Sequence, residues 1–208
     1  MFKIFADKKI VLASNSPRRR EILEMLDFNF IIRTPADSAE ADNASFSRRA
    51  GESMRDFAIR YTRAQAEAKA RDVYTNSELS DTEIILAADT VVYLDEEIMG
   101  KPEDDEDSRR MLRFLSGKTH YVCTAVSLIS NNRTSSFYDI SSVKFNPLDE
   151  IQEKLIELYL ASGSSECKAG AYGIQDAGAA FVQSISGDFY NCMGLPVTKL
   201  IRELHEFI

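Results

Sequence analysis

Hydroxyl and guanidinium side chains are concentrated in the stretch Ser14-Asn15-Ser16-Pro17-Arg18-Arg19-Arg20. The apolar run from Ile10 to Leu12 predicts a short strand leading into it. Pro17 suits the first position of a helix that Ser16 can cap. A helix start presents unpaired N–H groups and partial positive charge, which favour an anion. The stretch therefore predicts a binding loop for phosphate.

The charge balance of the chain bears on this prediction. With 25 Lys+Arg against 33 Asp+Glu, the formal net charge is −8, so there is no overall field to attract nucleic acid or an anionic membrane. An arginine triplet is often only the solvated outer turn of a surface helix, and that alternative stays open. On an acidic chain, next to two serines, the arginines favour one confined anion site.

A carboxylate follows the buried run Ile84 to Ala88, which predicts Asp89 at or near the end of a strand. Burying an unpaired carboxylate is costly, so Asp89 faces a cleft, meets a cation or serves as a local turn former. The neighbouring Thr90 can contact a ligand through its hydroxyl, or it is there because threonine favours strands.

Two further segments carry groups that suit a nucleotide. Lys101, in Gly100-Lys101-Pro102, places an ammonium on a turn, although such a turn is often only a surface feature. The segment from Lys168 to Gln175 has two glycines that allow close approach of a ligand, or form an irregular loop. Gln175 offers both a donor and an acceptor, which suits the edge of a nucleobase. The Gly-bounded loop 187–196 is a further candidate to line the same cleft.

Alternating helical and extended patterns must position these residues. We expect helices over 54–70 and 104–115, a helix from Asp149 to near Gly163 with Ile151, Leu155 and Leu158 on its apolar face, and a last helix from Pro196. Extended runs cover 83–88, 91–94, 119–129, 133–145 and 178–185, with a hairpin turn at Asn131-Asn132. This order predicts an α/β fold with a mixed sheet, in a single domain over 1–208.

Composition also excludes several classes of protein. Three widely spread cysteines argue against a disulfide framework and a structural zinc, and two histidines are too few for a multi-histidine metal site. Any metal would be a hard cation held by carboxylate and phosphate oxygens. No apolar run approaches the roughly 20 residues of a membrane span. The N-terminus has no signal-peptide pattern. We expect a cytoplasmic protein with no membrane or nucleic-acid partner.

Six motifs occur in an order and spacing that resemble the Maf family of nucleoside triphosphate pyrophosphatases, from about Val11 to Leu200. They are Ser14-x-Ser16-Pro17-Arg18-Arg19, Ala88-Asp89-Thr90-Val91-Val92, Gly100-Lys101-Pro102, Leu115-Ser116-Gly117-Lys118-Thr119-His120, Ala169-Gly170-Ala171-Tyr172-Gly173-Ile174-Gln175 and Gly194-Leu195-Pro196. The resemblance implies a fold related to the inosine triphosphate pyrophosphatases. That fold has a long central mixed sheet flanked by helices and a cleft between two lobes.

The resemblance also implies a reaction, the hydrolysis of a nucleoside triphosphate to the monophosphate and pyrophosphate with Mg²⁺ or Mn²⁺. It implies that Asp89 is the catalytic carboxylate and that Asp89 and Glu40 hold the metal. Its motif forms are similar to the branch acting on dTTP and UTP, and it suggests a homodimer. The substrate-binding residues that it implies are Ser14, Ser16, Arg18, Arg19, Lys69, Thr90, Lys101 and Gln175, with Arg18, Thr90 and Gln175 as specificity positions.

The chain departs from the usual family pattern at three places, and the residues also allow an alternative function. Residues 41–53 and 76–81 form longer segments than is typical of the family, and Asp176 follows Gln175 where a small residue is commoner. The longer segment puts the Glu40 assignment in question, and Asp176 has the potential to alter base selectivity. Asp89 is either a general base or chiefly a metal ligand. The alternative to catalysis is a non-catalytic nucleotide-binding regulator of cell division or septum formation.

Overall fold

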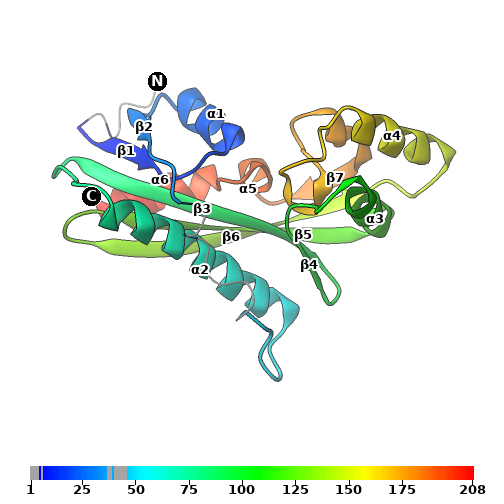
Figure 1. Cartoon of the computed structure of the whole chain (residues 1–208), viewed down its shortest axis with the longest axis horizontal. Coiled ribbons are helices and arrows are strands. Elements are labelled where there is room, and N and C mark those ends of the chain that lie inside the picture. Colours follow the sequence, from blue (N-terminus) through cyan, green and yellow to red (C-terminus); the bar gives the residue numbers. More distant parts are fainter. Residues whose placement is uncertain (1–4, 6, 37–38, 40–45) are drawn as a thin grey trace.

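A computed structural model describes residues 5, 7–36, 39 and 46–208 (Figure 1). Strands and helices alternate along the first half of the chain, and a long hairpin occupies the middle. The elements are β1 (Lys9–Leu12), α1 (Pro17–Met25), β2 (Phe30–Ile32), α2 (Met54–Thr75), β3 (Glu83–Leu94), β4 (Glu97–Met99), α3 (Asp105–Leu115), β5 (Thr119–Ile129), β6 (Thr134–Phe145), α4 (Glu150–Ala161), the 3₁₀ turns η4 (Ala169–Ala171) and η5 (Ala177–Phe181), β7 (Val182–Ser186), α5 (Phe189–Met193) and α6 (Val197–Phe207).

A mixed seven-stranded sheet forms the centre, in the order β2-β1-β3-β5-β6-β7, with β4 paired to β3 off this path. β1 runs parallel to β2 and β3, whereas β3, β5, β6 and β7 pair antiparallel. The β5–β6 hairpin closes at Asn131-Asn132, as expected. The predicted mixed α/β fold is therefore confirmed.

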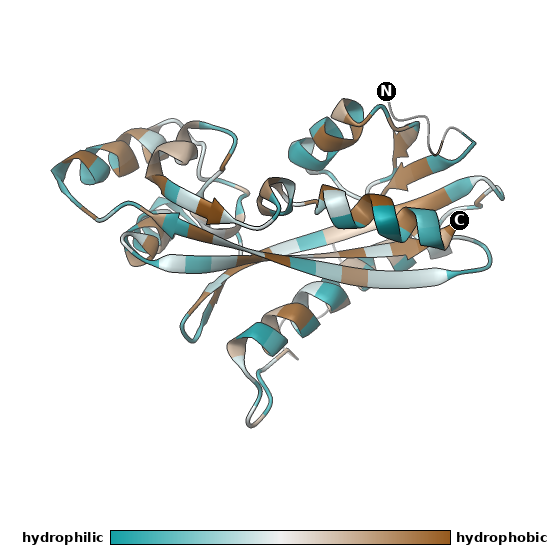
Figure 2. Cartoon of the chain, turned by 180° about the vertical axis from the view of Figure 1, so that it is seen from behind, coloured by the Kyte–Doolittle hydropathy of each residue, from teal (hydrophilic) through white to brown (hydrophobic). Residues whose placement is uncertain are grey.

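The two faces of the sheet are covered differently. α2 crosses one face, while α1, α5 and α6 lie on the other face together with α3 and α4 (Figure 1). Along β3 the side chains alternate between these faces, so that Leu86 and Val92 join the large core and Ile85 and Val91 lie on the α2 face. α6 carries hydrophobic residues along one side and polar residues along the other (Figure 2), and buries Val197, Leu200, Leu204 and Phe207.

β3 differs from its prediction. The sequence pattern divides it at Asp89-Thr90, but the structure shows one continuous strand from Glu83 to Leu94. Asp89 pairs with Ala125 of β5 in the middle of this strand, so its expected position at a strand end was wrong. Asp89 and Thr90 interrupt the apolar pattern of the strand. Both nevertheless pair with β5, so the strand continues through them.

The apolar face predicted for α4 is correct only for Leu155, which packs against the core. Asp149 caps the helix as expected, by accepting a hydrogen bond from the Gln152 amide. However, Ile151 and Leu158 are 67% and 68% exposed, whereas Ile156 and Tyr159 are buried. Apolar residues occur all round this helix, so two apolar stripes were possible. The stripe containing Tyr159 is buried because Tyr159 also hydrogen-bonds the segment after the helix.

The extended run predicted over 178–185 is only partly a strand. Residues Ala177–Phe181 form the 3₁₀ turn η5, and β7 begins at Val182. The Asp176 side chain accepts a hydrogen bond from the Gly178 amide, which starts a helical turn where the apolar pattern alone favours a strand. Among the described residues, no helix is long and apolar enough to cross a membrane.

Candidate active site

A gap in the sheet exposes the centre of β3. On one side of β3 the pairing with β1 ends at Leu86, and the pairing with β4 begins at Val92. Between these points the described elements place no strand on that side, although β5 pairs on the other. Asp89 and Thr90 lie in this gap. A carboxylate in the middle of a long buried strand therefore has access to solvent and ligands.

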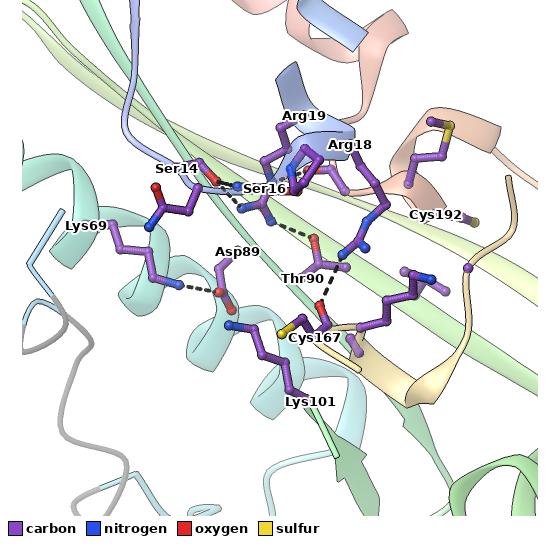
Figure 3. A pocket seen from close by; sticks show the side chains of 18 of the residues that line it. Ser14, Ser16, Arg18, Arg19, Lys69, Asp89, Thr90, Lys101, Cys167 and Cys192 are labelled. Atoms are coloured by element: carbon purple, nitrogen blue, oxygen red, sulfur yellow. Dashed lines mark hydrogen bonds and ion pairs between the residues drawn. The ribbon is translucent and has the colours of Figure 1, made fainter. Parts of the chain in front are cut away.

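A cavity of about 720 Å³ opens at this gap. Its lining includes every substrate-binding residue expected from the sequence, namely Ser14, Ser16, Arg18, Arg19, Lys69, Thr90, Lys101 and Gln175, together with Asp89 (Figure 3). Glu40, the other expected metal ligand, lies outside the described residues. We call Ser14, Ser16, Arg19, Lys69, Asp89 and Lys101 the cationic end of the cavity, and residues 166–175 the loop end.

The β1–α1 junction forms one wall of the cationic end. Ser16 occupies the N-cap position of α1 with Pro17 at the first turn, as predicted, but its hydroxyl caps no amide among the described residues. Instead the Ser16 amide donates to Ser14 Oγ (3.2 Å), which also accepts from Arg19 (3.1 Å). The first-turn amides thus face the cavity without a capping side chain, as a phosphate-binding helix start requires.

The Arg19 guanidinium donates hydrogen bonds to three separate segments of the chain. Besides Ser14, it donates to the Gly194 carbonyl (2.8 Å) and to Thr90 Oγ1 (3.1 Å). Burial lowers its pKa to about 10, so Arg19 remains charged at neutral pH. Thr90 in turn donates to Thr124, because the Thr124 proton is already given to the Asn191 carbonyl (2.9 Å). The Thr90 hydroxyl therefore holds Arg19 in place and has little capacity left for a ligand.

Asp89 projects from β3 toward α2, on the face opposite to Thr90. Its Oδ1 accepts a hydrogen bond from Lys69 Nζ of α2 at 2.7 Å, and the two side chains are only 17% and 16% exposed. Lys101, which follows β4, extends toward the same carboxylate (Figure 3). The cationic end thus combines one carboxylate with ammonium and guanidinium groups from α1, α2 and the β4–α3 connection.

Arg18 joins the two ends of the cavity. It starts from α1, and its Nη2 reaches the Cys167 carbonyl (3.4 Å) in the loop end (Figure 3). Burial lowers the pKa of Arg18, and the charge of Asp176 opposes that shift. Arg20, by contrast, points to solvent and pairs with Glu24 (2.8 Å). The expectation that all three arginines serve one anion site was therefore wrong for Arg20, which is a solvated helix residue.

The loop end is built from irregular backbone. Gln175 is exposed, and its amide makes no hydrogen bond to the residues that the structure describes, so both its donor and its acceptor are available. The predicted loop 187–196 also contributes, through Cys192, Met193 and Gly194. Sequence reasoning missed Asn15, Thr34, Glu166, Cys167 and Tyr172, which also line the cavity. Asn15 and Tyr172 lie inside motifs, whereas sequence carried little signal for Thr34, Glu166 and Cys167.

Across residues 5, 7–36, 39 and 46–208, no three His, Cys, Asp or Glu side chains gather where they could hold an ion. Asp89 alone is a carboxylate at the cationic end. This donor set suits a hard cation such as Mg²⁺, which is commonly bound by one or two carboxylates plus phosphate oxygens of the substrate.

Comparison with known proteins agrees with this geometry. A family model described as Maf-like protein matches residues 9–207, and the chain therefore belongs to the Maf family. Among its relatives is a protein of Bacillus mycoides named dTTP/UTP pyrophosphatase, which is 40% identical over 200 residues, covering 96% of this chain and 96% of the relative. A protein of the same name from Bacillus cytotoxicus has the same identity and coverage.

Proposed function

We propose that this protein hydrolyses pyrimidine nucleoside triphosphates, dTTP and UTP above all, to the monophosphate and pyrophosphate. The observation that carries the proposal is the gap in the sheet, where Asp89 lies among Arg19, Lys69 and Lys101 in one cavity. A triphosphate needs its charge neutralised and a water oriented for in-line attack. The names of the relatives from Bacillus support the choice of dTTP and UTP.

In this proposal the cationic end binds the phosphates. The first-turn amides of α1 and the Ser16 hydroxyl meet phosphate oxygens, and Arg19, Lys69 and Lys101 neutralise their charge. Asp89 accepts a proton from the attacking water or orients that water. A divalent cation held by Asp89, with Glu40 as second ligand, would neutralise further charge on the phosphate oxygens.

The loop end then accommodates the nucleoside. Gln175 offers its free amide to the polar edge of a uracil or thymine base, and Arg18 lies between the base and the phosphates. Thr90 acts indirectly, because its hydroxyl is bonded to Arg19 and Thr124. We further propose that the protein works in the cytoplasm as a homodimer, which light scattering of the purified protein would test.

A nucleotide panel tests the proposal. Pyrophosphate release is measured from dTTP, UTP, CTP, dATP and GTP with Mg²⁺, with Mn²⁺ and with a chelator. We expect turnover of UTP and dTTP above the others and a loss of turnover with the chelator. If no nucleotide is hydrolysed but UTP raises the melting temperature, the protein is a nucleotide-binding regulator, and the catalytic proposal is wrong.

A further inference from the structure

A partly buried ion pair lies directly behind the loop end, and the proposed function assigns it no part. Lys168 Nζ contacts Asp176 Oδ2, and their side chains are 13% and 31% exposed. Asp176 Oδ1 also accepts from the Tyr159 hydroxyl (3.1 Å) and from the Gly178 amide (2.9 Å). Asp176 itself is outside the cavity lining, whereas Lys168 and Gln175 belong to it.

The pair encloses the segment that carries Gln175. Lys168 stands at one end of this segment and Asp176 at the other, and Lys168 also donates to the Ser164 carbonyl. Tyr159 of α4 lies between them, since its hydroxyl accepts from the Gly173 amide (3.0 Å) and from Lys168 (3.3 Å). The network therefore fastens both ends of the segment to the same helix.

The backbone of this segment requires such fastening. Cys167 and Ala171 have φ angles of 57° and 61°, and Gly170 has 69°. The left-handed region is unfavourable for residues with a Cβ and persists only where surrounding contacts fix it. Gly170 is also closely packed, because a Cβ there would lie 2.9 Å from the Val92 side chain.

The Asp176 side chain packs closely against the segment 168–175 that precedes it. A Cβ at Gly173 would lie 2.3 Å from Asp176 Oδ2, so the carboxylate packs directly against the backbone of a cavity-lining residue. Burial, followed by the charge of Asp176, raises the pKa of Tyr159, so the phenol stays protonated and can donate. The charge of Asp176 also acts on Arg18, which reaches this loop from α1.

We propose that the Lys168–Asp176 pair is a positioning device that holds Gln175 in place for the pyrimidine base. It sets the affinity and selectivity for the base and leaves the hydrolytic step at Asp89 unchanged. This inference rests on the proposed function, since it assigns the loop end to the base. It also gives a role to Asp176, the residue at which the chain departs from its family pattern.

Asp176→Asn tests the pair, because it removes the charge and keeps the size of the side chain. We measure kcat and KM for UTP and CTP, and the inhibition constant of inorganic tripolyphosphate, which has no base. We expect the KM for UTP to rise about tenfold while kcat changes less than about twofold, with a smaller preference for UTP over CTP. The inhibition constant of tripolyphosphate should stay at the wild-type value.

Control variants separate positioning from general stability. Glu153→Gln, on α4, breaks an exposed ion pair with Arg113 of α3 and should leave all constants unchanged. In a double-mutant cycle, Lys168→Met combined with Asp176→Asn should be no worse than the more impaired single variant. A wild-type KM and selectivity in Asp176→Asn would overturn the inference, as would an equal loss of affinity for tripolyphosphate and UTP.

The proposed function and this inference fail in different ways. The dissociation constant of UTP is measured beside the kinetics. A wild-type protein that binds UTP without hydrolysing it overturns the proposed function, while the effect of Asp176→Asn on UTP affinity still decides the role of the pair. A wild-type protein that does not bind UTP overturns both.

Discussion

The cationic end and the loop end of the cavity are built from different kinds of structure. The cationic end uses regular elements: the start of α1, the middle of β3 and one side of α2 supply Ser16, Asp89 and Lys69. The loop end uses the irregular segment 166–175, in which residues adopt left-handed backbone angles. In the proposed function, the chemistry common to all triphosphates thus lies on regular elements, and the contacts proposed to select a base lie on a separate loop.

This difference makes the two ends separable by mutation. Changes at the cationic end should lower turnover of every nucleotide alike. Changes at the loop end should alter the order of preference among bases and leave the binding of tripolyphosphate intact. Arg18 lies where the two ends meet, because its guanidinium reaches the Cys167 carbonyl in the loop end.

Asp89→Asn should have the largest effect. We expect kcat for UTP to fall about 1,000-fold, since a positioned base or metal-bound carboxylate contributes on that order. Asp95→Asn, in the turn between β3 and β4, is the matched control, because Asn tolerates its positive φ of 52°.

The same variant separates the two roles of Asp89. Restoration of turnover by high Mg²⁺ or Mn²⁺ would identify Asp89 chiefly as a metal ligand. A loss of turnover that added metal does not restore, with unchanged metal affinity, would identify it as the base. Near-normal turnover would contradict both roles and the division of the cavity.

Arg19→Lys should come next. Lysine keeps the charge but cannot donate at once to Ser14, Thr90 and Gly194, so the cationic end loses the support that these three bonds give. We expect kcat/KM to fall about 100-fold for all nucleotides and the free energy of unfolding to fall by about 2 kcal/mol. Arg20→Lys, one residue further on the solvent side of α1, should match the wild type in both measurements. Losses of kcat/KM that differ among nucleotides with different bases would contradict the assignment of Arg19 to the cationic end.

His120 tests how the loop end is anchored in the core. It is buried on β5, and its Nε2 shares a hydrogen bond with the Tyr172 hydroxyl (2.8 Å). Burial lowers its pKa from 6.5 to about 3, so between these values the unfolded chain binds a proton that the folded protein does not. Stability therefore falls as pH falls, by about 2 kcal/mol from this group between pH 7 and pH 5.

Denaturant titrations at several pH values measure this effect. In His120→Asn the free energy of unfolding should change less with pH in that interval than in the wild type. This holds even if the variant is less stable than the wild type at pH 7. His205→Asn, which changes an exposed histidine in the last turn of α6, should keep the wild-type slope. An unchanged slope in His120→Asn would show that the histidine is not held neutral behind the loop end.

Gln175→Ala should have the smallest effect and the most selective one. We expect the preference for UTP over CTP to fall about tenfold, through KM, because one neutral hydrogen-bonding pair with the base is lost. Affinity for tripolyphosphate should not change. A uniform fall in turnover across nucleotides would contradict the assignment of Gln175 to the base.

Much of the cationic end was predictable from local sequence. The strand before Ser14, Pro17 at the start of α1 and the run before Asp89 are short-range patterns, and the structure brings all of them to one cavity. The gap beside Asp89 was not predictable, because it depends on where β1 and β4 stop pairing with β3. The points at which β1 and β4 stop pairing depend on tertiary structure, so the sequence of β3 itself carries no signal for the gap.

The loop end was less predictable for a related reason. The Lys168–Asp176 pair joins residues that flank a glycine-rich segment, and nothing in the local sequence pattern predicts that the two side chains meet. Its contacts with Tyr159 and Gly173 depend on which face of α4 is buried, and apolar spacing predicted that face correctly only at Leu155. Contacts among irregular segments thus determine which side of α4 is buried and how the segment carrying Gln175 is held, and neither can be predicted from apolar spacing.

The products formed from UTP test the central claim most directly. Wild-type protein is incubated with UTP and Mg²⁺, and phosphorus NMR identifies the products during the first turnovers. The proposed reaction predicts UMP and pyrophosphate in equal amounts, with neither UDP nor orthophosphate, and no reaction with Asp89→Asn on the same time scale. UDP with orthophosphate, or intact UTP, would contradict it.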